Sequence, residues 1–354
     1  MRSEATLRSK FPSMAEIIPL EQAVGKVLAH DITEIRPGQF KGPAFKKGHI
    51  VREEDLPHLR RLGKEHLFVL HISEGEYHED DAALMLADAL CGTNVEHNGK
   101  PAEGKITLRA SVAGLLKVNV EALTEFNMVP DVTCSARHNN DVVREGDAVA
   151  GTRAIPLVIR EESLLQAVGV AKEAGGIFSV KKFAKMRTGA VITGNEVYYG
   201  RINDKFAPIL RKKLGEFDCP LEEITFCPDE KDIIRDAIIN YAEKGMELIL
   251  VAGGMSVDPD DVSRVGISEA GATDLVYGSP VLPGAMFLYA RVKGIPVLGL
   301  PACVLYYKAT IFDLMLPRVL AGEKITRRTL AEMAHGGLCL NCEKCHYPIC
   351  PFGK

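Results

Sequence analysis

The sequence has no long apolar run and no strong excess of charge of one sign. No segment approaches the roughly 18 uninterrupted apolar residues of a membrane-spanning helix, and the start of the chain has no apolar core like that of a secretory signal. A net charge of −4 gives no electrostatic case for nucleic-acid binding, which usually leaves a basic footprint. We therefore expect a cytoplasmic protein that binds neither nucleic acid nor a membrane.

The composition is that of a globular protein, with 46% hydrophobic and 25% charged residues. At 354 residues the chain is long enough for more than one domain. We predict an N-terminal region of α+β and β-rich modules over 1–162 and a linker helix over 163–185. An α/β domain over 186–322 and a tail over 323–354 complete the predicted organisation.

The α/β domain is predicted from strands that alternate with helices. Apolar runs indicate the strands, and amphipathic segments after capping residues indicate the helices. This alternation is typical of a doubly wound, mostly parallel sheet. The predicted strands are 189–193, 221–226, 248–252, 275–277, 286–292 and 296–300, and the predicted helices are 204–217, 231–243, 262–269 and 306–320.

The N-terminal region has a less regular pattern. Apolar residues at helical spacing predict a short helix over 18–29 and another over 79–90, and 56–70 reads as a helix that runs into a strand. Short strands are predicted between residues 105 and 159. No catalytic constellation is apparent here, so we expect the site in the α/β domain.

Two glycine loops follow two of the predicted strands. In an open α/β sheet, ligands bind outside the carboxyl ends of the strands, where glycine lets backbone N–H groups approach a phosphate. The loop residues are Thr193, Gly194, Asn195 and Glu196 after the first strand, and Gly253, Gly254 and Ser256, followed by Asp261, after the third. This arrangement predicts a binding site for a phosphorylated ligand.

Four acidic residues are expected to converge on this edge of the sheet: Glu196, Asp204, Asp229 and Asp261. Converging carboxylates repel unless a cation neutralises them, which points to Mg²⁺ together with a phosphorylated ligand. The alternative is that each acid caps a helix or lies in its first turn. That alternative has most weight for Asp204 and Asp229, whereas Glu196 and Asp261 fit a functional role better.

These motifs resemble those of the molybdopterin molybdenumtransferase family. Residues 186–320 look like the molybdopterin-binding domain of molybdenum cofactor biosynthesis proteins. The family's TG-acid-E loop is similar to 193–196, its TGG-x-S-x-G…D loop to 252–261, and its opening PLE segment to 19–29.

The resemblance implies Mg²⁺-dependent insertion of molybdate into adenylated molybdopterin with release of AMP, carried out by a homodimer. By this resemblance Glu196, Asp229 and Asp261 would be the catalytic acids, with Asp261 and Glu196 as metal ligands. Gly253, Gly254 and Ser256 would hold the phosphate of the pterin. The other cofactor-binding positions would be Thr193, Gly194, Asn195, Asp204, Pro283 and Gly284.

Two segments depart from the family pattern. Leu282 and Ala285 stand where the family's KPGKP segment has lysines, whose point charges would hold an oxyanion. The family's LPGNP turn reads differently over 300–304, and Lys205, Lys293 or Lys308 could compensate for the lost charge. The alternative is therefore a non-catalytic cofactor carrier or a maturation factor for a molybdenum enzyme. A third reading is an unrelated nucleotide- or sugar-phosphate-binding enzyme.

The tail contains four of the nine cysteines, Cys339, Cys342, Cys345 and Cys350, in a C-x2-C-x2-C-x4-C-P run. This spacing is close to that of bacterial ferredoxins and favours an iron–sulfur cluster, with Zn²⁺ as the second reading and redox-active or unused thiols as the third. Typical members of the family have no such tail, which suggests docking or redox sensing towards a molybdenum enzyme. The five other cysteines are expected to be buried thiols.

Overall fold

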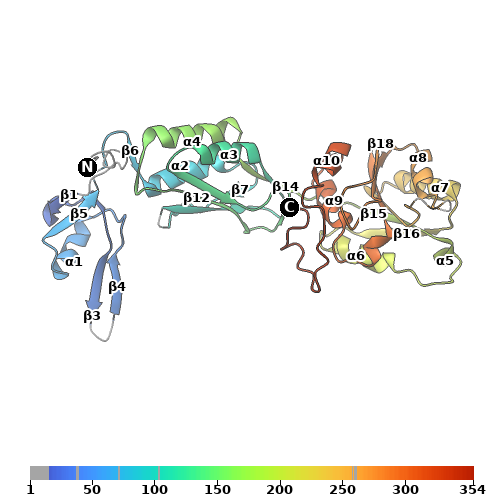
Figure 1. Ribbon diagram of the computed structural model, residues 1–354, viewed down its shortest axis with the longest axis horizontal. Coiled ribbons are helices and arrows are strands. Elements are labelled where there is room, and N and C mark those ends of the chain that lie inside the picture. Colours follow the sequence, from blue (N-terminus) through green and yellow to red (C-terminus); the bar gives the residue numbers. More distant parts are fainter. Residues whose placement is uncertain (1–15, 37–39, 71, 103, 257, 259–260) are drawn as a thin grey trace, which may run out of the picture. The chain divides into compact units, whose positions relative to one another are not determined.

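The computed structural model divides into two units (Figure 1), of which the first runs to Val180 and the second from Lys181 to Lys354, apart from 113–115 and 140–142, which group with the second. Within the described residues, no helix combines the length and apolarity that crossing a bilayer requires. The described residues are 16–36, 40–70, 72–102, 104–256, 258 and 261–354.

The N-terminal part of the first unit contains a small antiparallel sheet in the order β1-β5-β2, a hairpin of β3 and β4, and one short helix. The predicted helix over 18–29 is wrong. Pro19 has no N–H to donate, and Gly25 adopts a left-handed φ of 81°, so the segment forms the end of β1, one turn of 3-10 helix over Leu20–Gln22, and β2. The elements are β1 (Glu16–Pro19), β2 (Val27–Leu28), β3 (Ile32–Arg36), β4 (Phe40–Phe45), α1 (Leu56–Arg61) and β5 (His66–Leu70).

The rest of the first unit packs three helices against a four-stranded antiparallel sheet in the order β10-β12-β8-β7 (Figure 1). The predicted linker helix over 163–185 does not exist as such. Its residues form α4, whose Leu164, Ala167 and Ala171 are fully buried in this unit's core, and then a strand. The main elements are α2 (Glu79–Leu90), β7 (Val95–Glu96), β8 (Lys105–Ala110), α3 (Val120–Met128), β10 (Val132–Ala136), β12 (Ala148–Ala154), α4 (Glu161–Glu173) and β14 (Phe178–Lys182).

The second unit contains a six-stranded sheet in the order β16-β15-β17-β20-β19-β18. The first four strands are parallel, and β19 is antiparallel to both of its neighbours, β20 and β18, which confirms the predicted mostly parallel α/β sheet. The strands are β15 (Thr188–Thr193), β16 (Leu221–Cys227), β17 (Leu248–Ala252), β18 (Thr273–Tyr277), β19 (Leu288–Val292) and β20 (Ile295–Leu300).

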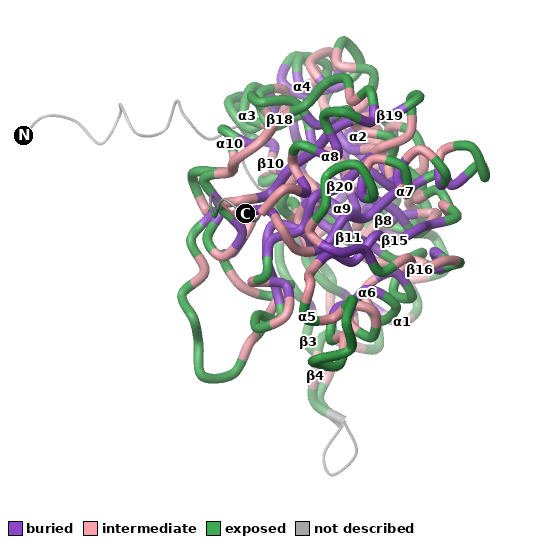
Figure 2. Tube along the Cα trace, turned by 90° about the vertical axis from the view of Figure 1, so that its right-hand side faces the viewer, coloured by how far each residue is buried: buried purple, intermediate pink, exposed green. Residues whose placement is uncertain are grey.

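Helices cover both faces of this sheet, so its central strands are buried throughout (Figure 2). Leu248 and Leu250 of β17 pack in one apolar cluster, whereas Ile249 and Val251 pack in the other. Burial on both faces explains why this strand reads as a continuous apolar run. The helices are α5 (Asn195–Tyr198), α6 (Phe206–Gly215), α7 (Lys231–Glu243), α8 (Ser263–Glu269), α9 (Ile311–Leu320) and α10 (Arg327–Glu332).

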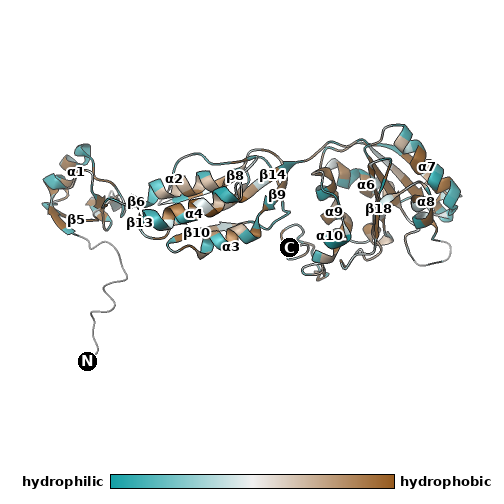
Figure 3. Cartoon of the chain, turned by 90° about the horizontal axis from the view of Figure 1, so that it is seen from above, coloured by the Kyte–Doolittle hydropathy of each residue, from teal (hydrophilic) through white to brown (hydrophobic). Residues whose placement is uncertain are grey.

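Helix α7 shows how a sequence pattern produces one of these layers. Ile234, Ile238 and Tyr241 lie three or four positions apart, so they share one face of the helix, and all three are fully buried. The opposite face is polar, and both kinds of surface are visible along α7 in Figure 3. Helix α7 therefore covers part of one face of the sheet with its apolar side, and the ends of the strands remain free for the loops.

Candidate functional site

The glycine loops lie together at the carboxyl edge of the sheet. Strands β15, β16, β17 and β20 are parallel, so the loops that follow them leave from the same edge. The N–H of Gly194 donates to the carbonyl oxygen of Cys227 at 3.2 Å, and the N–H of Gly253 donates to that of Leu300 at 3.4 Å. We call 194–196 the first glycine loop and 253–256 the second.

The second glycine loop packs so closely against β15 that side chains do not fit. Gly253 has a φ of 97°, and a Cβ there would lie 2.6 Å from the carbonyl oxygen of Thr193. Gly254 has a φ of 61°, and its Cβ would overlap with Oγ of Ser263. Ser263 Oγ is in turn 3.0 Å from Oγ1 of Thr193, so one hydroxyl pair links the beginning of α8 to the end of β15. Glycine is required by both conformation and space.

Asp229 binds the first glycine loop through a reciprocal pair of hydrogen bonds. The N–H of Asn195 donates to Oδ2 of Asp229 at 2.9 Å, and the N–H of Asp229 donates to Oδ1 of Asn195 at 3.3 Å. Asp229 therefore fixes this loop to the end of β16. Glu196, which follows Asn195 in the chain, is exposed at the start of α5.

Asp261 plays the corresponding part in the second glycine loop. Its Oδ2 accepts the N–H of Ser256 at 2.8 Å, and the residue is partly buried. One carboxylate oxygen is thus used in shaping the loop. Across the described residues, no group of three His, Cys, Asp or Glu side chains is placed to hold one metal ion. The structure brings each loop together with one aspartate and does not gather all the acids at one point.

Asp204 has the geometry of a helix cap. Its Oδ1 accepts the N–H of Phe206 and its Oδ2 accepts the N–H of Ala207, both at 2.9 Å. These bonds satisfy two of the N–H groups that the first turn of α6 leaves without partners. The capping interpretation therefore accounts for both oxygens of this side chain.

Pro283 and Gly284 lie in the turn between β18 and β19, at the same edge of the sheet. The carbonyl oxygen of Pro283 accepts the N–H of Ile311 at 3.2 Å. Gly284 has a φ of 134°, and a Cβ there would overlap with the side chain of Ile311. The turn thus packs against the beginning of α9 through these two residues.

The same turn forms backbone hydrogen bonds with the cysteine tail. The N–H of Leu282 donates to the carbonyl oxygen of Gly337, and the N–H of Cys339 donates to that of Leu282, both at 2.8 Å. Further along the tail, Phe352 is buried in the core of the second unit. The two departures from the family pattern, the missing lysine at Leu282 and the added tail, therefore meet at one place.

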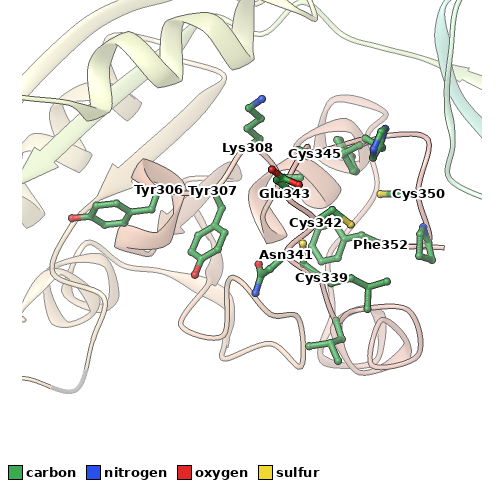
Figure 4. Close-up of a pocket in the computed structure, with 16 residues that line it drawn as sticks. Tyr306, Tyr307, Lys308, Cys339, Asn341, Cys342, Glu343, Cys345, Cys350 and Phe352 are labelled. Atoms are coloured by element: carbon green, nitrogen blue, oxygen red, sulfur yellow. The ribbon is translucent and has the colours of Figure 1, made fainter.

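All four tail cysteines line one cavity of about 480 Å³. Its other wall is formed by the residues that follow β20, including Tyr307 and Lys308 (Figure 4). None of the nine cysteines is in a disulfide. The cavity therefore combines four thiol groups with one lysine, Lys308.

Of the five other cysteines, Cys134, Cys219 and Cys227 are buried as predicted, whereas Cys91 and Cys303 are only partly buried. Burial raises the pKa of Cys91 to about 11, that of Cys134 to about 12 and that of Cys227 to about 11. Burial also raises the pKa of Cys219 and Cys303. These thiols stay protonated near neutral pH, as expected for structural cysteines.

The sequence patterns missed two residues of this edge, Tyr277 and Arg264. The hydroxyl of Tyr277 donates to the carbonyl oxygen of Met255 at 2.8 Å, which supports the second glycine loop from β18. The guanidinium carbon of Arg264 lies 4.4 Å from the centre of the Tyr277 ring. The position of Tyr277 at the carboxyl end of a strand is the only signal that could have indicated it.

Comparisons with known proteins bear on both units. Residues 189–321 match the family model "Probable molybdopterin binding domain", and residues 17–71 match one described as a domain of unknown function. A molybdopterin molybdenumtransferase of Haemophilus influenzae is 22% identical over 338 residues, which are 91% of this chain and 77% of that protein. A CinA-like protein of Mycobacterium tuberculosis is 38% identical over 77 residues, 22% of this chain and only 18% of that protein.

Similar solved structures are more distant. A CinA protein from Thermoplasma acidophilum has a TM-score of 0.34 at 18% identity, over 38% of this chain and 99% of that one. A molybdopterin biosynthesis Mog protein from Mycobacterium ulcerans has a TM-score of 0.32 at 17% identity, over 38% of this chain and 92% of that one.

Proposed function

We propose that this chain acts in molybdenum cofactor biosynthesis, as a protein similar to the molybdopterin molybdenumtransferases, and that it binds adenylated molybdopterin at its two glycine loops. It then inserts molybdate and releases AMP. The observation that carries the proposal is the close packing of the second glycine loop against Thr193, the residue before the first glycine loop, at the carboxyl edge of the sheet. The reciprocal Asn195–Asp229 bonds hold the first glycine loop at the same edge. A loop of this kind presents N–H groups to a phosphate.

The acids of the two loops fit Mg²⁺ when it is bound together with the ligand. Mg²⁺ usually takes one or two carboxylates and completes its shell with water and substrate phosphates. Asp261 and Glu196 would hold it, with Asp229 beside them, and the ion would neutralise charge on the phosphates. This chain's own task is to orient the bound group, because the loops are fixed in place by hydrogen bonds before the ligand arrives.

A carrier role is the second candidate, and a specific observation favours it. The position of Leu282 lacks the family's lysine and is paired with the tail, so the positive charge expected there is missing. A carrier would bind the pterin without releasing AMP and would pass the cofactor to a molybdenum enzyme. Release of AMP that requires both Mg²⁺ and molybdate tests the transferase, and pterin binding without release supports the carrier.

We also propose that the working form is a homodimer, which sedimentation velocity tests.

We propose that the tail cysteines bind a metal, as an iron–sulfur cluster or as Zn²⁺, and serve docking or redox sensing towards a molybdenum enzyme. The support is that all four line the same cavity and that none is in a disulfide. The thiols would have to approach one another on binding, because no three of them are placed around one point here. Thiolates at this spacing are the ligands that both metals prefer.

The tail therefore makes a prediction about metal content. Anaerobically purified protein is expected to contain iron and acid-labile sulfide, or one zinc, and Cys342→Ser with Cys345→Ser should remove it. Elemental analysis and visible absorption measure this, with Cys91→Ser as the control that should keep the metal. Removing the metal should expose four thiols to a disulfide reagent at pH 8, while the buried thiols with raised pKa react only after unfolding. Unchanged metal content in the double variant would contradict the assignment.

A further inference from the structure

Arg264 carries an unusual buried group. Its Nε is the one buried side-chain nitrogen or oxygen in the described part of the chain that has no hydrogen-bond partner. A guanidinium stays charged in proteins and offers five N–H donors. A buried donor without an acceptor costs free energy, so such a group calls for an explanation.

The position of Arg264 relates it to the second glycine loop. It follows Ser263, whose hydroxyl contacts Thr193 and whose Oγ occupies the space that a side chain at Gly254 would need. Its guanidinium stacks on Tyr277, the residue that donates to the carbonyl oxygen of Met255. Stacking fixes the plane of the guanidinium while leaving its N–H groups available.

Among the residues that the structure describes, Arg264 has no acidic side chain as an ion-pair partner. The aspartate nearest in sequence, Asp261, directs one carboxylate oxygen at the N–H of Ser256. The guanidinium of Arg264 is thus a positive charge close to the second glycine loop, and an oxyanion bound by that loop would be its partner.

We propose that Arg264 binds the tetrahedral oxyanion held by the second glycine loop, and so supplies the positive charge that Leu282 and Ala285 do not. This inference rests on the proposed function of the same loops. The shared chemistry is that of phosphate and molybdate, both of which a planar guanidinium recognises through paired hydrogen bonds. Either the phosphate of the pterin or the incoming molybdate is the occupant.

The test is the affinity of the full chain for adenylated molybdopterin, measured by anaerobic equilibrium dialysis. Arg264→Gln should weaken binding by about tenfold or more, since a charge-assisted hydrogen bond is lost. Arg264→Lys should lose less, because it keeps the charge without the planar geometry. Arg328→Gln is the matched control, since that arginine is exposed on α10 and pairs with Glu332. Should Arg264→Gln fail to fold, Arg264→Met carries the same test.

Two further measurements distinguish a binding role of Arg264 from a purely structural one. Raising the salt concentration should weaken binding to the natural chain more steeply than to Arg264→Gln, because screening acts on the charge. Inorganic phosphate or molybdate can also be added as a competitor of adenylated molybdopterin. If phosphate competes with binding to the natural chain but not to Arg264→Gln, the pterin phosphate is the occupant. If molybdate shows this difference instead, molybdate is the occupant. Equal affinity and equal salt dependence in the variant would overturn the role of Arg264 and leave the proposed function standing. Absence of binding by the natural chain would overturn both.

Discussion

Replacing Asp261 by Asn is expected to lower Mg²⁺-dependent AMP release by about 100-fold or more while the fold is kept. The amide oxygen of Asn can still accept the N–H of Ser256, a bond of 2.8 Å in the natural chain, so the loop keeps its shape. What is lost is the negative charge that Mg²⁺ needs. Glu196→Gln, in the exposed acid of the first glycine loop, should have a similar effect.

The measurement is AMP release by chromatography, with far-ultraviolet circular dichroism and thermal unfolding as checks on the fold. Asp232→Asn is the matched control, because that carboxylate is exposed on α7 and pairs with Arg235. The control should release AMP at the natural rate. Full turnover by both Asp261→Asn and Glu196→Gln would show that these acids are not the Mg²⁺ site.

Gly254→Ala is expected to give the largest loss of stability, about 3 kcal/mol in the free energy of unfolding, and to abolish pterin binding. A left-handed φ of 61° is strained for alanine, and the added methyl group would overlap with the buried hydroxyl of Ser263. Strain and overpacking each cost about 1–2 kcal/mol. Ser263 cannot move aside without breaking its contact with Thr193, which links the beginning of α8 to the end of β15.

Chemical unfolding monitored by fluorescence or circular dichroism measures the loss. Gly271→Ala is the control for backbone strain alone, because its φ is 82° and no atom lies within 4 Å of the added Cβ. This control should lose only about 1 kcal/mol and keep pterin binding. Equal losses in the two variants would mean that the packing of Gly254 against Ser263 is not what holds the loop.

The fold of the second unit could be predicted because its signals are strong and local. Apolar runs such as β17 and amphipathic helices such as α7 each have one dominant periodicity, and their alternation has one common topology. The carboxyl ends of parallel strands meet at one edge, so the proximity of the glycine loops to each other and to Asp229 also followed from the order of the strands.

The first unit could not be predicted as well, because short segments carry conflicting signals. Residues 18–29 have apolar residues at helical spacing, yet Pro19 and Gly25 limit the helical part to one 3-10 turn over Leu20–Gln22. Helix α3 begins at a capping residue, Asn119, whose side chain accepts the N–H of Ala122, but it was hidden in a region that reads as strands. Helix α4 looked like a linker because its small residues, such as Ala167 and Ala171, pack closely in the core.

The finer geometry of the site lay beyond any sequence pattern. The pairing of Leu282 with the tail joins residues that are far apart in the chain, and the stack of Arg264 on Tyr277 joins a helix to the next strand. Such contacts depend on how strands are ordered and on which side chains are left without partners, and neither has a local periodicity. The spacing of the cysteines indicated a common role, but not the cavity that they share with Lys308.

The central claim, that this edge of the sheet transfers molybdate to the adenylated pterin, is tested most directly by AMP release. Anaerobically purified full chain would be mixed with adenylated molybdopterin and Mg²⁺, with and without molybdate. We expect AMP release that depends on Mg²⁺ and is stimulated by molybdate. Tight pterin binding with no AMP release under any of these conditions would contradict the transferase and make the chain a cofactor carrier.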